Sequence, residues 1–183
     1  MNDRRMLLPL ALAVLVSAGT ISSFSAASPS HRAVPKPGAL RAKVAPKGNA
    51  RLTRRLRAVT WRWQVVMGRR RTRLGAPLDT RRALRFWRLK ARMVQRRAAR
   101  PPHRTGWVCI HRYEGSWRDS GDPYWGGLQM DRGFMRAYAP RVLLRRGWAD
   151  HWSPLEQMWV AEHAHRGRGY TPWPNTARSC GLL

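Results

Sequence analysis

The distribution of charge constrains the fold of this chain more than any other feature of its sequence. The 183 residues carry a formal net charge of +27. Residues 28–100 hold 23 lysines and arginines against one acidic residue, Asp79, whereas residues 101–183 hold 11 against seven. A segment with so few acidic groups cannot neutralise its own cations, so we expect only the C-terminal part to form an ordinary globular core. The basic part is expected to be an arm that binds polyanions.

The N-terminal residues 1–27 have the pattern of a secretory signal peptide. Arg4 and Arg5 precede a short apolar run, and the small residues 25–27 suit signal peptidase. The run is shorter than the about 20 apolar residues that a membrane span needs. We therefore expect a secreted protein associated with the cell wall or cell surface; a retained membrane anchor and an unexported chain are the alternatives. Residues 28–50, rich in Pro, Ala and Lys, are expected to be a disordered linker.

Residues 51–100 are predicted to form a basic arm of two amphipathic helices. Apolar residues recur there at helical steps, at Leu52, Leu56, Val59, Trp63 and Val66 and again at Leu84, Trp87, Ala91 and Val94. Asp79 and Thr80 could cap the second helix. The helices could pack on each other or on the C-terminal domain, with arginines facing water. The functional interpretation, compatible with that packing, is a cationic surface that binds an anionic cell-wall polymer or membrane surface.

Residues 103–183 are predicted to form a small, mainly helical α+β domain with a short β-hairpin. The elements that we expect are helices over 107–117, 134–145 with a break near Pro140, and 153–165, a hairpin over 124–130, and an irregular tail from Gly169. The third helix has the clearest start, because Ser153, Pro154 and Glu156 supply an N-cap, a first-turn proline and a capping-box acid.

Two cysteines, Cys109 and Cys180, lie near the two ends of this domain. In an exported protein a single pair of cysteines indicates one disulfide, with two free buried thiols as the alternative. Glu162, His163 and His165 offer part of a zinc site, but a His-x-His pair alone is a weak signal. We therefore expect neither a metal nor a cofactor.

One acidic residue, Glu114, stands among aromatic residues in the stretch 107–131. On a continuous helix Trp117, three residues further on, would lie on the same face. Aromatic surroundings remove water from a carboxyl group and favour its protonated form. A protonated carboxyl can act as a general acid, as cleavage of a glycosidic bond requires. The structural alternative is an ion pair between Glu114 and an arginine such as Arg118.

Three motifs follow one another in this domain: E-G-S-W from Glu114, Y-W-G-G-L-Q-M from Tyr124, and W-P at Trp173 with Cys180 after it. Together they resemble the transglycosylase-like domain of the resuscitation-promoting factors and, more widely, the lysozyme-like lytic transglycosylases. The resemblance implies a small α+β lysozyme-like domain, peptidoglycan as substrate and Glu114 as the catalytic acid. The residues then expected to bind substrate are Trp117, Tyr124, Trp125, Gly127, Gln129 and Asp131.

The chain departs from this family pattern at two places. The family has a cysteine directly before the catalytic Glu, whereas this chain has Tyr113 there and its cysteine, Cys109, lies earlier. The segment from the Glu to the Trp is also one residue shorter than usual. A Cys109–Cys180 disulfide would therefore follow a different path.

The resemblance favours a single Glu that acts first as acid and then as base. As base it would activate either water or the muramic 6-hydroxyl, and the latter gives a 1,6-anhydro product. Candidates for a second carboxylate are Asp119, Asp122 and Asp131. The sequence leaves open a non-catalytic glycan-binding module and cooperation with a wall endopeptidase. A nucleic-acid-binding protein is suggested by charge alone; because the export signal argues against it, no specific nucleic acid is expected.

Overall fold

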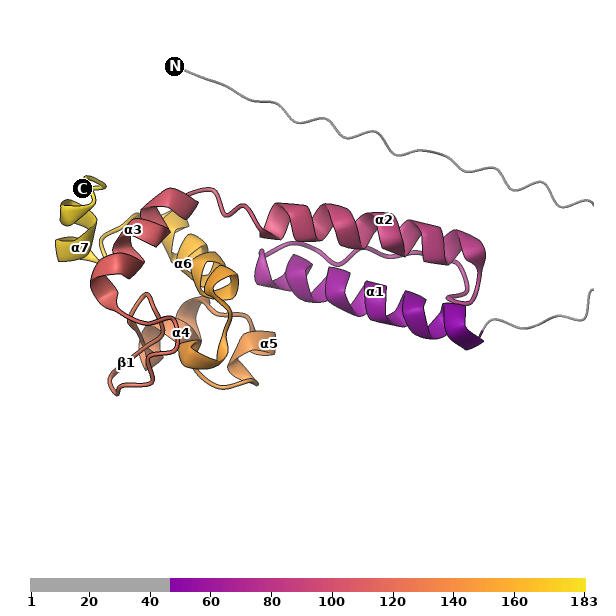
Figure 1. Cartoon of the computed structure of the whole chain (residues 1–183), viewed down its shortest axis with the longest axis horizontal. Coiled ribbons are helices and arrows are strands. Elements are labelled where there is room, and N and C mark those ends of the chain that lie inside the picture. Colours follow the sequence, from indigo (N-terminus) through magenta and orange to yellow (C-terminus); the bar gives the residue numbers. More distant parts are fainter. Residues whose placement is uncertain (1–46) are drawn as a thin grey trace, which may run out of the picture. The chain divides into compact units, whose positions relative to one another are not determined.

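The computed structural model describes residues 47–183 (Figure 1). The expected signal peptide, residues 1–27, and residues 28–46 of the expected linker lie outside the described residues. The described part is mostly helical with one two-stranded antiparallel sheet, in agreement with a small α+β protein. Between residues 47 and 183, no helix is both long enough and apolar enough to cross a membrane.

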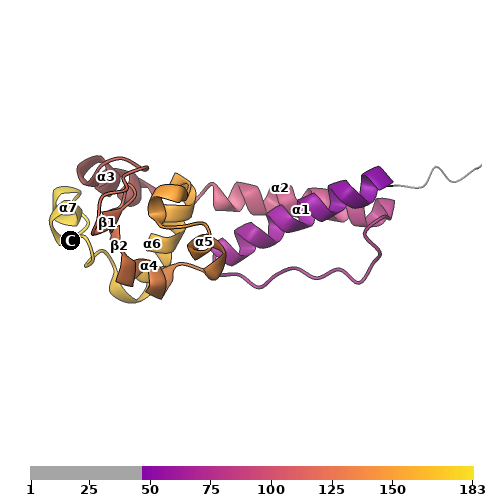
Figure 2. The same ribbon diagram turned by 90° about the horizontal axis from the view of Figure 1, so that it is seen from below.

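The arm consists of two helices, α1 (Lys47–Val66) and α2 (Arg81–Ala98), which pack along each other. They run in the same direction, because the segment that joins them returns along α1 (Figures 1 and 2). Thr72 of that segment is held to α1 by Trp61, whose Nε1 donates to the Thr72 carbonyl oxygen at 2.7 Å. The carboxyl ends of both helices therefore reach the C-terminal domain.

The buried side of α1 differs from the apolar stripe that the sequence predicts. Leu52 and Val59 are each 36% exposed, whereas Thr53 and Thr60 are fully buried. Both threonine hydroxyls donate to backbone carbonyl oxygens four residues earlier, at 2.7 and 2.8 Å, which satisfies them inside the helix pair. The helix also begins at Lys47, within the residues expected to be linker.

Helix α2 follows the sequence prediction closely. The hydroxyl of Thr80 caps it by accepting from the amide of Ala83 at 3.1 Å. Leu84, Trp87 and Ala91 are buried along one face, as their spacing predicts.

Short helices surround a small hairpin in the C-terminal domain. In chain order the elements are α3 (Arg104–Glu114), β1 (Tyr124–Trp125), β2 (Met130–Asp131), α4 (Arg132–Tyr138), α5 (Arg141–Leu144), the 3-10 turn η1 (Ala149–His151), α6 (Pro154–Arg168) and α7 (Pro174–Ser179). In the antiparallel register Tyr124 pairs with Asp131 and Trp125 with Met130.

The hairpin, the break at Pro140 and the capped start of α6 are confirmed. The end of the domain's first helix and the irregular tail were predicted wrongly. Helix α3 ends at Glu114, not at Trp117, because Gly115 takes a backbone conformation outside the helix. The tail is not irregular throughout: it contains α7, whose first residue, Pro174, occupies a position where a missing N–H costs little.

A buried glutamine of α6, Gln157, fixes the turns around the hairpin. Its Oε1 accepts from the amide of Gly127 at 2.9 Å. Its Nε2 donates to the carbonyl oxygens of Trp117 and Ala149 at 2.9 and 2.8 Å. One fully buried side chain thus ties the hairpin turn, the segment after α3 and the turn η1 to α6.

The arm and the C-terminal domain share one apolar core. Val66, Met67 and Ala98, at the ends of the arm helices, belong to the same buried cluster as Trp107 and Trp152 of the domain. Polar contacts reinforce this junction, because the indole of Trp159 donates to the carbonyl oxygen of Ala98 at 2.9 Å.

A buried carboxylate, Glu156 of α6, also joins the arm to the domain. It accepts hydrogen bonds from Arg62 of α1 and, at 2.7 Å, from Arg146. Burial alone would raise the pKa of Glu156, but the hydrogen bonds from Arg146, the Ser153 backbone and Arg62 outweigh it and hold the pKa below its ordinary value of 4.5.

We expect Glu156→Gln to lower the free energy of unfolding at pH 7 by about 2–4 kcal/mol, because two arginines lose their buried partner. A carboxyl group whose pKa is lowered in the folded protein contributes stability at pH values above its unfolded pKa of 4.5. This stability is lost as the pH falls below 4.5 and through the folded pKa. The wild-type protein should therefore lose this stability between pH 4.5 and more acidic values, and the variant should not. Urea unfolding at pH 7 and pH 3 measures both.

Asp122→Asn is the matched control. Asp122 pairs with Arg132 at 2.9 Å, but both side chains are more than half exposed. The change should leave stability nearly unaltered. If Glu156→Gln kept the same acid dependence as the wild type, Glu156 would not be the group that titrates.

Candidate active site

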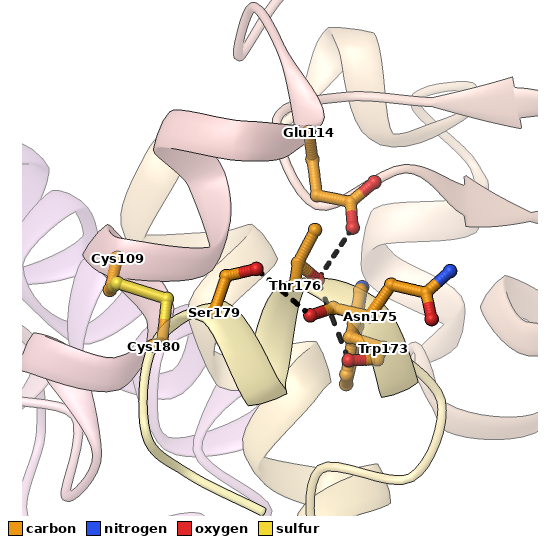
Figure 3. The surroundings of a disulfide bond; sticks show 7 residues. All are labelled: Cys109, Glu114, Trp173, Asn175, Thr176, Ser179 and Cys180. Carbon is orange, nitrogen blue, oxygen red and sulfur yellow. Dashed lines mark hydrogen bonds between the residues drawn. A yellow bond between two sulfur atoms is a disulfide. The ribbon is translucent and has the colours of Figure 1, made fainter.

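Glu114 is the last residue of α3 and its side chain points toward α7 (Figure 3). The helix stops there because Gly115 has φ 126°, which favours glycine over all other residues. The half-buried carboxyl group of Glu114 accepts a hydrogen bond at Oε1 from the hydroxyl of Thr176, at 2.8 Å. The end of α3 and the first turn of α7 thus position one carboxyl group together.

One cavity adjoins this carboxyl group, and a second cavity lies beside the first. The first, about 230 Å³, is lined by Glu114 and by Tyr124, Gln129, Pro172, Trp173, Pro174, Asn175 and Thr176. The second, about 320 Å³, shares Tyr124, Gln129, Pro172 and Trp173 with the first and extends to Asp131, Tyr138 and Arg168. Because they share walls, the two cavities form adjacent compartments of one candidate cleft.

Three of the expected substrate-binding residues line this cleft. Tyr124 is about half exposed at its rim, and Gln129 lies in the wall between the two cavities. Asp131 lines the second cavity and also caps α4, accepting from the amide of Phe134 at 2.6 Å. These positions all come from the two strands of the hairpin and the turn between them.

The other three expected residues lie in the packing around the cleft. Trp117 stacks on His111, with ring centroids 3.9 Å apart. Gly127 lies against both, since a Cβ there would be 2.5 Å from His111 Nδ1 and 2.7 Å from Trp117 Cε3. Trp125 is 6% exposed, and the guanidinium of Arg132 lies 5.0 Å from its ring centroid. Trp117 is not on the helix face of Glu114, because α3 has already ended.

The amide of Gln129 is held in one orientation by Asp119. Gln129 has φ 45°, a conformation that non-glycine residues rarely adopt. Its Nε2 donates to Asp119 Oδ2 at 2.7 Å and to the carbonyl oxygen of Gly126 at 3.0 Å. Both amide hydrogens are thus used within the loop, which leaves Oε1 to accept a hydrogen bond from a ligand.

The predicted disulfide between Cys109 and Cys180 is confirmed, with the two Cα atoms 6.0 Å apart. Cys109 belongs to α3 and Cys180 follows α7, so the bond joins the two helices that hold Glu114 and Thr176 (Figure 3).

No family model matches this sequence. A search of curated proteins also found no match.

A group of metal-ligating side chains lies elsewhere, at the start of α3. His103, Glu162 and His165 have ligand atoms within 4.8 Å of one another. Glu162 Oε1 accepts from the His103 amide and from Trp107 Nε1, both at 2.8 Å, and its Oε2 lies 3.0 Å from His103 Nδ1. These bonds satisfy the carboxylate structurally. The three could hold zinc only with a further ligand.

His163, which the sequence analysis grouped with Glu162 and His165, does not belong to this group of ligands. Its Nδ1 lies 3.0 Å from the carbonyl oxygen of Tyr138, and burial lowers its pKa. The histidine that completes the group of three is His103, from a different part of the chain.

Thr176 and Asn175 were not predicted from the sequence, and neither was the contact between Asp119 and Gln129. Thr176 lies in the segment between Trp173 and Cys180, so the family resemblance covered it without marking it. Arg168, the last residue of α6, lines the second cavity and carried no signal in the sequence.

For the glycan substrate that the resemblance implies, we expect Asp119→Asn to raise the KM for soluble oligomers roughly tenfold with a smaller change in kcat. The two carboxylate oxygens of Asp119 accept hydrogen bonds from the Gly121 amide and from Gln129 Nε2. An asparagine side chain has only one oxygen, so it cannot accept both hydrogen bonds with separate oxygens. The Gln129 amide would then lose its fixed orientation. Asp122→Asn, in the same loop, is the control and should change neither constant. A kcat loss as large as that of Glu114→Gln would instead identify Asp119 as a second catalytic carboxylate.

Proposed function

We propose that this chain is a secreted peptidoglycan-cleaving enzyme with a lysozyme-like domain, in which Glu114 is the single general acid and base. The observation that carries the proposal is the position of Glu114, whose carboxyl group lines a cavity beside Tyr124, Gln129 and Trp173. Aromatic walls with a few placed polar groups suit a sugar polymer, because sugars present both apolar faces and hydroxyl groups.

In this mechanism Glu114 first gives its proton to the glycosidic oxygen as the bond between that oxygen and C1 breaks. The resulting carboxylate then takes a proton from the attacking group. Attack by water leaves a reducing end, and attack by the muramic 6-hydroxyl leaves a 1,6-anhydro end. Thr176 orients the carboxyl group by donating to Oε1, so that Oε2 is the oxygen available to substrate.

A single-carboxyl mechanism is supported by the lining of the cavity. Among residues 47–183, Glu114 is the one carboxyl group that lines it. Asp119 is engaged with Gln129, Asp122 with Arg132, and Asp131 lines the neighbouring cavity.

The second candidate function is a non-catalytic glycan-binding module on the same domain. It is favoured by the position of Trp117, which stacks on His111 and lines neither cavity next to Glu114. In either case the basic arm would hold the protein to an anionic polymer of the wall or to a membrane surface.

Digestion of purified peptidoglycan, with soluble products read by mass, separates these functions. We expect muropeptide fragments, and a mass lower by one water at the muramic end would identify a lytic transglycosylase. Sedimentation of the protein with the wall, without release of fragments, would establish the binding module instead. Failure both to bind and to cleave would contradict both functions.

A further inference from the structure

The arm carries positive charge that the rest of the described structure does not neutralise. Residues 47–100 contain 19 lysines and arginines and one acidic residue, Asp79. Among residues 47–183, the arginines in ion pairs are Arg62, Arg132 and Arg146. Of these three only Arg62 belongs to the arm. A fold that orders so many unpaired guanidinium groups is suited to an external polyanion.

Two of these arginines lie beside one indole ring, that of Trp61. The guanidinium carbons of Arg57 and Arg71 lie 4.6 and 5.6 Å from the ring centroid. The segment that carries Arg71 is fixed to α1 at Thr72, whose hydroxyl and amide both bond to the Gln64 amide group, at 2.7 and 3.0 Å. The arginines beside Thr72 are therefore presented by an anchored backbone.

This arrangement borders a cavity of about 770 Å³ lined by Trp61, Arg70, Arg71 and Arg73. No carboxylate lines it, so the three arginines of the lining have no counter-ion among the lining residues. Each guanidinium can bond two oxygens of one phosphate in a planar fork. We propose that this cluster, Trp61 with Arg70, Arg71 and Arg73, binds a polymer of small polyols joined by phosphodiesters.

The aromatic residues of the arm argue against a nucleic acid as the partner. Binding of single strands uses open aromatic faces on which bases stack. The Trp61 ring is engaged by two guanidinium groups, and Trp87 is 1% exposed. Phe86 lies edge-on to Trp87 with the Lys90 ammonium 5.7 Å from its centroid. Trp63 packs against the apolar core, with the Arg62 guanidinium carbon 5.9 Å from its ring centroid. Each aromatic ring of α1 and α2 is therefore buried or has a cation beside it, so the arm offers cations for phosphates rather than open rings for bases.

The cluster supplies the partner of the arm and in this respect rests on the proposed function, but it does not depend on the chemistry of Glu114. Its test uses the Glu114→Gln protein, so that binding is measured whether or not the C-terminal domain cleaves a glycan. The probe is a poly(glycerol phosphate) of defined length, and affinity is measured over a series of salt concentrations. A single-stranded oligonucleotide of equal charge and vesicles containing an anionic phospholipid are tested in parallel.

Two triple variants decide whether the cluster is the site. Arg70→Gln/Arg71→Gln/Arg73→Gln should weaken binding at least tenfold. The slope of log K against log salt should become less steep by about 2, on the basis of the roughly 0.7–0.9 that each phosphate contact contributes with nucleic acids. The control, Arg112→Gln/Arg145→Gln/Arg178→Gln, removes equal charge from exposed sites of the C-terminal domain and should change the slope little.

The lysine series, Arg70→Lys/Arg71→Lys/Arg73→Lys, keeps the charge but loses the planar fork, and it should bind with intermediate affinity. If the arm triple and the control triple of glutamine substitutions weakened binding equally, the proposal would be overturned, because affinity would then depend only on the net charge of the protein. Tighter binding of the oligonucleotide or of the vesicles, lost in the arm triple, would overturn it in favour of a nucleic acid or a membrane surface.

Discussion

Replacing Glu114 with Gln should abolish the release of glycan fragments from peptidoglycan, with a rate loss on the order of 10²–10⁴-fold or more. The change keeps the size of the side chain and an oxygen that can accept from Thr176. It removes the proton that the leaving oxygen needs and the base that the second step needs. Initial rates on soluble glycan oligomers measure the loss, and circular dichroism checks the fold.

Asp131→Asn is the matched control for this experiment. It makes the same carboxylate-to-amide change in the neighbouring cavity, and Asn is a good N-cap, so α4 should keep its start. We expect a loss of less than about tenfold, because binding contacts contribute less than the proton transfer. Activity that persists in folded Glu114→Gln would refute the role of Glu114. Equal losses in the two variants would indicate a mechanism with two carboxylates.

Removal of the disulfide, as Cys109→Ser/Cys180→Ser, should lower the free energy of unfolding by about 4 kcal/mol. The two cysteines are 71 residues apart in sequence, and a loop of that length loses much of its freedom in the unfolded chain when it is closed. For a domain of this size such a loss is a large part of the total stability. Urea unfolding of both proteins under the same conditions measures the difference.

The same double variant should lose activity even under conditions where it remains folded. The disulfide holds α7 to α3, and α7 supplies Thr176 to Glu114 (Figure 3). Thr176→Val is the control, because it removes the hydrogen bond and leaves the disulfide. If Thr176→Val lowers activity with little effect on unfolding, the two contributions are separate. If the free energy of unfolding were unchanged without the disulfide, closure of the loop between the two cysteines would not stabilise the fold.

Features that depend on a few neighbouring residues could be predicted from the sequence. Ser153 and Glu156 form their capping box within one turn, and Thr80 caps α2 in the same way. The disulfide could be predicted without knowledge of the fold, because two cysteines allow only one intramolecular pairing. The assignment of Glu114 as the catalytic acid rests on its place among aromatic residues and on the family resemblance, and it stays a prediction.

Features that depend on distant residues could not be predicted in this way. Thr53 and Thr60 occupy the buried side of α1 because their hydroxyls bond within the helix, which a count of apolar residues does not register. The end of α3 at Gly115 moved Trp117 from the face of Glu114 to a stack on His111. The pairing of Thr176 with Glu114 joins residues 62 positions apart, and only the folded chain brings them together.

The junction around Glu156 limits the positions that the C-terminal domain can reach when the arm is bound to a polymer. An anchor on a flexible tether lets a catalytic domain sweep a volume, and the reach then grows with tether length. Here Arg62 of the arm and Arg146 of the domain share one buried carboxylate, and both parts contribute to one core. A molecule held through the arm would keep its cleft at a set distance from the anchoring polymer. The glycan strands that it could cleave would then be those within that distance of the anchor.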